Sequence, residues 1–238
     1  MLREQVLVTC EHASNRLPAD LTLDRRLLDL HIAWDPGALV IAERMARRWR
    51  VPVLSGEFSR LVVDLNRSIG NRMLIRRVSD GHRIPFNYGL SAVDQQARID
   101  RYYRPYRDAV AAAAEQIVAR HGRCVHVCVH TFTAALAGNE RANDIGLLHD
   151  PQWGVERAVC AEIKACLERR ADLVAWYNRP YSGTADGILP AMRQAHSPER
   201  LVGIELEVNQ RHAGDRTRLH RIADVVVDAL EDSTALSS

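Results

Sequence analysis

The stretch RCVHVCVHTFT, residues 123–133, is an unbroken run of residues in which valines alternate with cysteines and histidines before a threonine-rich end. Successive side chains of a β-strand point to opposite faces, so Cys124, His126, Cys128 and His130 share one face and the valines share the other. The two cysteines and His126 lie inside the run and are predicted to pack in the core. His130 ends the run beside Thr131, which places it at the edge of a sheet.

Strand-like and helix-like segments alternate along the rest of the chain. We expect strands at residues 5–10, 51–58, 59–66, 144–150, 172–178 and 201–210, and helices at residues 22–34, 35–50, 93–122, 154–170 and 217–232. This alternation is typical of an α/β protein whose sheet is covered by helices on both faces. No internal repeat or low-complexity linker interrupts it, and we expect a single domain over residues 1–238.

The stretch EFSRLVVDLNRS, residues 57–68, has an apolar centre that is flanked by charged and amide side chains. We expect a short buried strand here, with Asp64, Asn66 and Arg67 at its exit. The following residues 69–91 lack a clear period and are rich in turn formers. A loop of that length is usually functional or mobile, and its length and composition permit a lid over a site.

Composition excludes several classes of protein. The 238 residues carry a formal net charge of +2, from 32 basic and 30 acidic residues that are mixed along the chain. A nucleic-acid-binding surface would show as a basic stripe with interleaved aromatic residues, which is not seen. No apolar run approaches the roughly 20 residues of a membrane span. We therefore expect neither a nucleic-acid partner nor a membrane anchor, and the oligomeric state is left open.

The amino-terminal segment and the cysteines indicate a cytoplasmic protein. MLREQVLVTCEHAS leads directly into a strand and lacks the layout of a signal peptide. The five cysteines are odd in number and mostly lie in apolar runs, so a disulfide framework is not expected.

Polar residues follow several strands where they end. Ligands of open α/β sheets gather at the carboxyl ends of the strands. His12 follows the first strand and His130 ends another, so the two imidazoles are expected to bind one metal ion. Zinc in a hydrolase takes about three protein ligands of His and Asp/Glu type and keeps a position open for water.

The third ligand should be a carboxylate, and the sequence offers Glu11, Asp35 and Asp64. Asp35 precedes Pro36-Gly37 at the start of a helix, where it is equally suited to cap that helix. Glu11 adjoins His12, and neighbouring strand residues face opposite ways, which makes Glu11 the weaker ligand. Glu205 and Glu207 share one face of a later apolar strand. Buried carboxylates there need a partner, and one of the two is a candidate general base.

Six segments together resemble the N-formylglutamate amidohydrolase family. They are CEHASN (10–15), HIAWDPGA (31–38), SRLVVDLNR (59–67), VHTFT (129–133), NRPYSG (178–183) and GIELEVN (203–209), in the order in which the family has them. The family is similar in fold to the zinc carboxypeptidases, which implies a three-layer α/β/α domain around a mixed, mostly parallel sheet. It also implies Zn²⁺, or another divalent transition metal, as cofactor.

The resemblance assigns roles to individual residues. It makes His12 and His130 metal ligands, Glu205 the general base, and Asn66 with Arg67 a clamp for a substrate carboxylate. The carboxypeptidase pattern has a glutamate three residues after the first histidine, but this chain has Asn15 there. The resemblance therefore favours Asp35 as the acidic ligand.

Other residues are weaker candidates. Arg60 and Arg179 are suited to bind substrate carboxylates or to form structural ion pairs. His196 is a candidate for polarising the scissile carbonyl or placing a carboxylate, or a loop histidine. Asp64 can support a ligand histidine or Arg67. Remaining residues are assigned to packing (Tyr102, Tyr103, Tyr106) or to a turn that lines the pocket (Asn178, Tyr181, Ser182).

The expected function is metal-dependent hydrolysis of a small N-acylated acidic amino acid, with N-formyl-L-glutamate as the leading substrate. Three alternatives remain: a zinc hydrolase of another N-acyl amino acid or short peptide, a catalytically silent binding protein, and a cysteine hydrolase. The last would use Cys10 beside His12 and requires an exposed thiol of low pKa.

Overall fold

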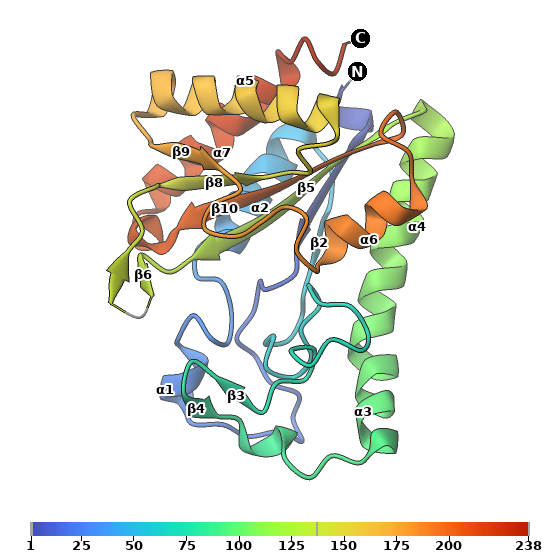
Figure 1. The fold of residues 1–238 in the computed structure, drawn as a ribbon, viewed down its shortest axis with the longest axis vertical. Coiled ribbons are helices and arrows are strands. Elements are labelled where there is room, and N and C mark those ends of the chain that lie inside the picture. Colours follow the sequence, from blue (N-terminus) through green and yellow to red (C-terminus); the bar gives the residue numbers. More distant parts are fainter. Residues whose placement is uncertain (1, 137, 238) are drawn as a thin grey trace.

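The structure is a computed structural model that describes residues 2–136 and 138–237. Its centre is a six-stranded sheet in the order β2-β1-β5-β10-β8-β9 (Figure 1). The strands are β1 (Val6–Cys10), β2 (Val53–Ser55), β5 (Cys124–Phe132), β8 (Ile145–Leu148), β9 (Ala175–Tyr177) and β10 (Leu201–Asn209). Strands β2, β1, β5 and β10 are mutually parallel, whereas β8 pairs antiparallel with β10. The sheet is therefore mixed and mostly parallel, as expected.

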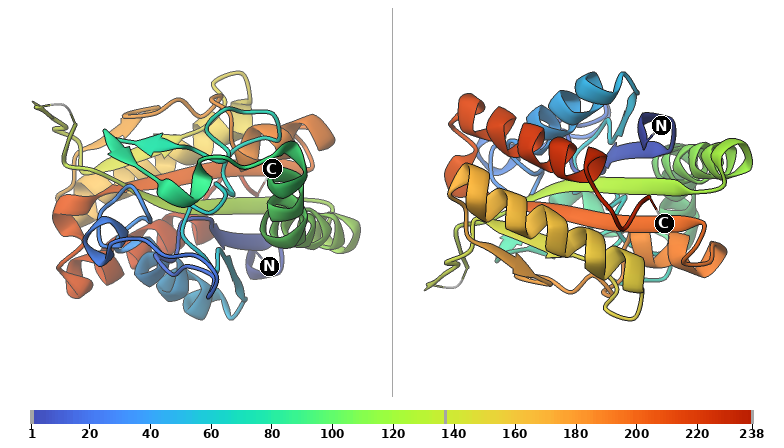
Figure 2. Two further views of the ribbon diagram at one scale, coloured as in Figure 1. Left: turned by 90° about the horizontal axis from the view of Figure 1, so that it is seen from below. Right: turned by 90° about the horizontal axis from the view of Figure 1, so that it is seen from above.

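Helices cover both faces of the sheet. Helices α2 (Ala38–Trp49), α7 (Arg216–Glu231) and α5 (Gly154–Ala171) pack side by side on one face, as the view from above in Figure 2 shows. They bury the valines of β1, β5 and β10. Helices α4 (Arg104–His121) and α6 (Ile188–Ala195) cover the opposite face, where Cys124 and Cys128 are buried. The three-layer α/β/α fold is thus confirmed.

A region of loops and short elements lies beyond the carboxyl ends of β1 and β5, in the lower half of Figure 1. It contains α1 (Arg25–Leu28), β3 (Val78–Ser79), β4 (His82–Arg83), a 3₁₀ turn (Pro85–Asn87) and α3 (Ala92–Arg98). A π-helical turn (Ile99–Tyr103) joins α3 to α4, so one helical segment runs from this region to the sheet. The remaining short elements are 3₁₀ turns Leu2–Glu4 and Gln210–His212 and the hairpin β6 (Ala135–Leu136) and β7 (Asn139–Glu140).

The prediction of a strand at residues 59–66 is wrong. Residues 59–66 form consecutive turns, and residues 61–66 are all buried instead of alternating. Their backbone amides bond to loops rather than to a neighbouring strand: Ser59 to the carbonyl of Arg16, Arg60 to that of Ala33, and Asp64 to that of Leu74. A three-residue apolar run has no detectable period, so it fits a buried turn as well as a strand.

Other boundaries also differ from the expected ones. The helix expected over residues 22–34 is reduced to the four residues of α1, and the strand expected over 51–58 is reduced to β2. Helix α6 was not expected from the sequence at all. Residues 69–91 form the anticipated loop, with only β3, β4 and a 3₁₀ turn inside it.

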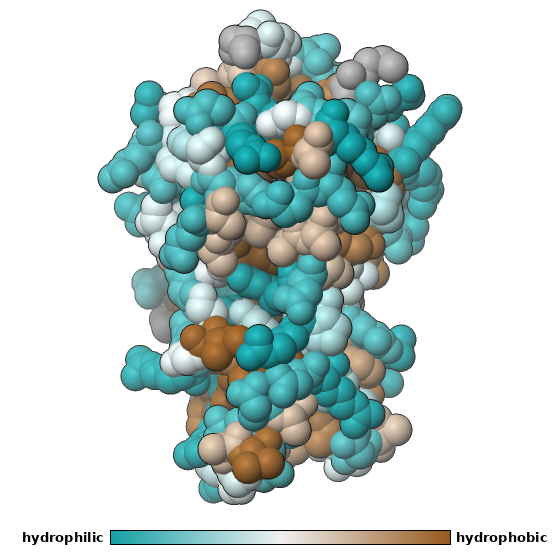
Figure 3. All heavy atoms as spheres, turned by 90° about the vertical axis from the view of Figure 1, so that its right-hand side faces the viewer, coloured by the Kyte–Doolittle hydropathy of each residue, from teal (hydrophilic) through white to brown (hydrophobic). Residues whose placement is uncertain are grey.

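One face of the molecule can be followed in a space-filling view. On the face seen in Figure 3, hydrophilic side chains predominate and hydrophobic ones are scattered between them. Among the described residues, no helix is both long enough and apolar enough to cross a lipid bilayer.

Candidate metal centre and its cavity

Three buried side chains predicted as metal ligands meet where β1 and β5 end. His12 lies two residues beyond β1, His130 lies within β5, and Asp35 lies in the segment that precedes α2. One ligand atom from each of the three lies within 4.8 Å of the others. The Asp35 amide donates to the carbonyl of His12 at 2.9 Å, which fixes the Asp35 backbone beside the first histidine.

Both histidines present Nδ1 to the same carboxylate oxygen. Asp35 Oδ2 lies 3.3 Å from His12 Nδ1 and 2.9 Å from His130 Nδ1. Asp35 does not cap helix α2, because the N-cap is Gly37 and no side chain bonds to that end of the helix. The alternative role of Asp35 as a helix cap therefore fails, and its carboxylate faces the two imidazoles.

The remaining ring nitrogens also face buried carboxylates. His12 Nε2 lies 2.7 Å from Asp64 Oδ1, and His130 Nε2 lies 2.9 Å from Glu11 Oε2. Tyr106 donates to Glu11 Oε1 at 2.8 Å. Ligand histidines usually hold a carboxylate with the ring nitrogen that does not bind the metal, which fixes the tautomer and the ring orientation. Glu11 and Asp64 occupy the corresponding positions behind the two imidazole rings, and Asp35 stands between the rings.

Mutual contact favours the charged forms of Asp35, Glu11 and His130 despite their burial. Burial alone would raise the pKa of both Asp35 and Glu11. For Asp35, contact with His12 and His130 instead holds the pKa below its usual range. For Glu11, contact with His130 is the main cause that lowers the pKa to about 2. Burial alone would lower the pKa of His130, whereas Glu205, Asp35 and Glu11 raise it well above its ordinary value. A positive charge among these side chains is therefore strongly favoured.

The donor set fits zinc. Two imidazole nitrogens and one carboxylate oxygen are the ligands of a catalytic zinc site that keeps a position open for water. The carboxylates behind both rings match the outer partners that such ligands require. Asp35, rather than Glu11 or Asp64, is the acidic residue that faces both Nδ1 atoms.

The cluster opens into a cavity of about 390 Å³. Its wall includes His12, Asp35 and His130, the arginines Arg60, Arg67 and Arg76, and both Glu205 and Glu207. The loop of residues 69–91 contributes Met73, Val78, Ser79 and Asp80 in addition to Arg76, so this loop forms part of the wall. A volume near the lower end of the range for small-molecule sites suits a ligand of amino-acid size.

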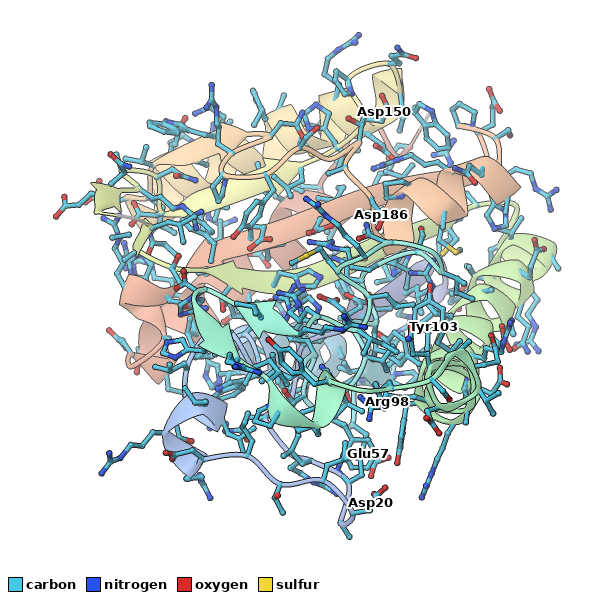
Figure 4. All side chains as sticks on the ribbon, turned by 60° about the horizontal axis from the view of Figure 1, so that its bottom comes forward. Asp20, Glu57, Arg98, Tyr103, Asp150 and Asp186 are labelled. Carbon is cyan, nitrogen blue, oxygen red and sulfur yellow. The ribbon has the colours of Figure 1, made fainter. Side chains whose placement is uncertain are left out.

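The expected carboxylate clamp is held in place from several sides. Asn66 accepts the amide of Ile188 at Oδ1 (2.7 Å), and its Nδ2 lies 3.4 Å from His130 Nε2. Arg67 Nη1 donates to the carbonyls of Asn66 (2.7 Å) and Asp186 (2.9 Å). Tyr103, in the π-helical turn that joins α3 to α4, donates its hydroxyl to the carbonyl of Arg67 at 2.7 Å. Tyr103 and Asp186 are labelled in Figure 4. The amide of Asn66 is thus occupied by the protein, whereas among the described residues only Nη1 of the Arg67 guanidinium has hydrogen-bond acceptors.

Glu205 and Glu207 both line the cavity, but their surroundings differ. In the parallel pairing of β10 with β5, Glu207 lies opposite His130 and Glu205 lies opposite Cys128. Glu207 is 3% exposed, and its Oε2 has no hydrogen-bond partner among the described residues. Burial, with the negative charges of Glu205 and Asp35, raises the pKa of Glu207 to about 8 although His130 opposes the shift.

Two predicted substrate-binding residues are not brought to the cavity. Among the described residues that line it, neither Arg179 nor His196 occurs. Arg179 is exposed on the segment after β9. His196 lies at the carboxyl end of α6, 3.7 Å from Glu115 on α4. Tyr181 and Ser182 of the same turn as Asn178 do line the cavity, whereas Asn178 bonds to the amides of His149 and Gly183.

The cysteine-hydrolase alternative requires an exposed Cys10 thiol of low pKa, and the structure shows neither property. Cys10 is fully buried on the face covered by α2, and burial with the charge of Glu11 raises the pKa of its thiol well above the ordinary value. His126 behaves as the core histidine expected from its place in the strand. Its Nε2 lies 3.0 Å from Thr9 Oγ1, and burial lowers its pKa to about 4.

Arg76 and the support given by Glu11 and Tyr106 were not found from the sequence. Arg76 lies in a loop without a period, so no pattern distinguishes it from the other arginines nearby. Glu11 was considered only as a ligand, and Tyr106 only as a packing residue. The one available signal was that Glu11 adjoins His12 at a strand end.

The family model described as N-formylglutamate amidohydrolase matches residues 4–213 of this chain. A gene product of Agrobacterium tumefaciens with a crystal structure is 29% identical, with a TM-score of 0.81 over 98% of this chain and 90% of that one. The N-formylglutamate amidohydrolase of Ralstonia eutropha is 19% identical and shares the fold, with a TM-score of 0.73 over 96% of this chain and 94% of that one. No curated protein matches the sequence. Since the family model covers most of its length, the chain belongs to the N-formylglutamate amidohydrolase family.

Proposed function

We propose that this protein hydrolyses the amide of N-formyl-L-glutamate, giving L-glutamate and formate, in a zinc-dependent reaction. The observation that carries the proposal is the buried cluster His12–Asp35–His130 at the wall of a cavity that three arginines also line. Membership of an amidohydrolase family supports an amide as the bond that is cleaved. The arginines support an anionic substrate, because a guanidinium matches a carboxylate bidentately.

His12, Asp35 and His130 would hold the zinc ion. When bound, zinc supplies a Lewis acid for the amide carbonyl and lowers the pKa of a water molecule. Asp64 and Glu11 keep the two imidazoles in position through the ring nitrogens that face away from Asp35. Arg67, which the carbonyls of Asn66 and Asp186 hold, is placed to bind the α-carboxylate of the substrate.

The general base belongs to the Glu205–Glu207 pair. The family resemblance implies Glu205, whereas the sheet register favours Glu207, because Glu207 is the carboxylate opposite His130. Its Oε2 is also free of partners within the described part of the chain. A group whose pKa lies near the working pH can take a proton from water and return it to the leaving amine. We therefore place the base at Glu207, with Glu205 as the alternative.

The test is formate release from N-formyl-L-glutamate by wild type, Glu207→Gln and Glu205→Gln. If Glu207 is the base, Glu207→Gln lowers kcat about 100- to 10,000-fold while zinc content stays at the wild-type level. Glu205→Gln, a matched change on the same face of β10, loses much less. A larger loss in Glu205→Gln would move the base to that residue.

Wild-type assays with other substrates decide between the related functions. Hydrolysis of N-acetyl or peptidyl substrates without formate release would make the protein a different acyl-amino-acid hydrolase. Zinc and glutamate binding without hydrolysis of any of them would make it a binding protein with this fold.

A further inference from the structure

Of the described arginines that line the cavity, Arg76 is the one that the sequence did not single out. It lies in the loop of residues 69–91, and its side chain is 10% exposed. Its Nη2 contacts Asp64 Oδ2 at 2.5 Å and its Nη1 lies 3.4 Å from Ser79 Oγ. Its Nε is buried without a hydrogen-bond partner in the described structure. A buried N–H without a partner is costly, so the contacts with Asp64 and Ser79 leave the Arg76 guanidinium incompletely satisfied.

The charges around the cavity leave Arg76 only partly neutralised. Asp64 is shared, because Arg60 donates to its Oδ2 from Nε (3.1 Å) and Nη2 (2.8 Å) while His12 occupies its Oδ1. Arg60 has a second carboxylate near it, since its Nη1 lies 3.5 Å from Asp35. Arg76 has no carboxylate other than Asp64 among the described ion pairs.

Arg67 is the second cation in this position. Within the described residues its guanidinium donates to the backbone carbonyls of Asn66 and Asp186 and forms no ion pair. Asp186 and Asp80, which also line the cavity, have other partners. Asp186 accepts from the amides of Ser68 and Asn71, and Asp80 lies 3.5 Å from His31. A ligand with two carboxylates would complete the neutralisation of both Arg67 and Arg76, whereas a ligand with one would leave either Arg67 without an acidic partner or Arg76 with only the shared Asp64.

We propose that Arg76 determines specificity by binding the side-chain carboxylate of the substrate, while Arg67 binds the α-carboxylate. This inference rests on the proposed function and deepens it, because it explains why an acidic amino acid is selected. The loop of residues 69–91 thereby contributes a recognition residue in addition to enclosing the cavity. Asp64 positions Arg76 and His12 together, so the acidic-group recognition site and the metal centre share one carboxylate.

The experiment compares two substrates that differ only in the side-chain group: N-formyl-L-glutamate and N-formyl-L-glutamine. For zinc-loaded wild type, Arg76→Met and Arg67→Met, the measured quantity is kcat/KM for each substrate. Loss of a charge-assisted hydrogen bond corresponds to about 10- to 100-fold. Arg76→Met should therefore lower the ratio of glutamate to glutamine turnover about 10- to 100-fold. Arg67→Met is the matched control: both substrates share the α-carboxylate, so their turnover should fall together and the ratio should stay the same.

A purely structural role for Arg76 predicts a different result. If Arg76 only holds Asp64, Arg76→Met lowers turnover of both substrates by the same factor, and the proposal is overturned. Arg76→Lys guards against a folding defect, because lysine keeps the charge but lacks the planar fork. It should recover part of the preference for the acidic substrate.

Calorimetric binding of L-glutamate and L-glutamine gives a second readout that needs no turnover. Tighter binding of L-glutamate to wild type, lost in Arg76→Met, supports the role of Arg76 even if wild type releases no formate and the proposed reaction is wrong. Equal binding of the two amino acids to wild type overturns it.

Discussion

Each metal-centre histidine is held by two carboxylates, one at each ring nitrogen. His12 lies between Asp35 and Asp64, and His130 lies between Asp35 and Glu11. This arrangement allows one nitrogen of each ring to bind zinc while the other stays anchored. The ring orientation is therefore set before a metal binds, which reduces the cost of organising the site.

The first prediction concerns the carboxylate behind His12. Asp64→Asn should weaken zinc binding about 10- to 100-fold, because the amide no longer holds the ring as a carboxylate does. Competition with a chelator of known affinity measures the change. Asp144→Asn is the control: Asp144 forms a similar pair with His212 at 2.7 Å, away from the cavity, so its zinc affinity should equal that of wild type. Unchanged affinity in Asp64→Asn would contradict the supporting role.

The sequence predicts the position of a residue best where its local context is strong. His12 follows β1 and His130 lies near the end of β5; the two strands are parallel, so their carboxyl ends meet at one edge of the sheet. Asp35 could be chosen over Glu11 and Asp64 only through a resemblance, because its backbone position beside His12 depends on a tertiary hydrogen bond. Arg76 could not be named, since its role depends on how a long loop folds back on Asp64.

Among the elements, α6 is fixed to the sheet by a buried ion pair. Arg193 of α6 donates to both carboxylate oxygens of Glu156 on α5, at 3.0 and 2.9 Å. The same carboxylate accepts the amide of Gly203 in β10 at 2.8 Å, and Arg193 Nη1 donates to the carbonyl of Gly183 at 2.7 Å. The pair thus connects α5, α6 and β10, and it anchors the turn that carries Tyr181 and Ser182.

Glu156→Gln should therefore lower the free energy of unfolding by about 3–5 kcal/mol, because it leaves the Arg193 charge buried without its partner. Denaturant unfolding followed by circular dichroism measures this. Asp100→Asn is the comparison, since Asp100 and Arg104 form a half-exposed pair, and a change of about 1 kcal/mol or less is expected there. Similar small effects for both variants would contradict the structural importance of the buried pair.

Helix α6 also shows where reading elements from sequence fails. Its eight residues include Pro190, and the segment is too short for a clear period. The long helices α4, α5 and α7 and the nine-residue strands β5 and β10 repeat their pattern often enough to be recognised. The buried turns at residues 59–66 were mistaken for a strand because three apolar residues fit either structure.

At the scale of the whole molecule, one wall of the cavity is formed by the regular sheet and the other by irregular loops. The sheet supplies His130, Glu205 and Glu207, while the loop region supplies Asp35 and the arginines. The layered fold follows from repeating patterns, and so it could be predicted from the sequence. The wall of loops depends on individual buried contacts, such as those of Asp64 and Asn66, and these leave no periodic signal.

The central claim is that His12, Asp35 and His130 bind the zinc ion on which amide hydrolysis depends. It is tested most directly by metal content and formate release, measured together on purified wild type and His130→Ala. The account predicts about one zinc per wild-type chain and release of formate from N-formyl-L-glutamate, with both lost in His130→Ala. Equal zinc content in the two proteins, or formate release that persists in His130→Ala after chelation, would contradict it.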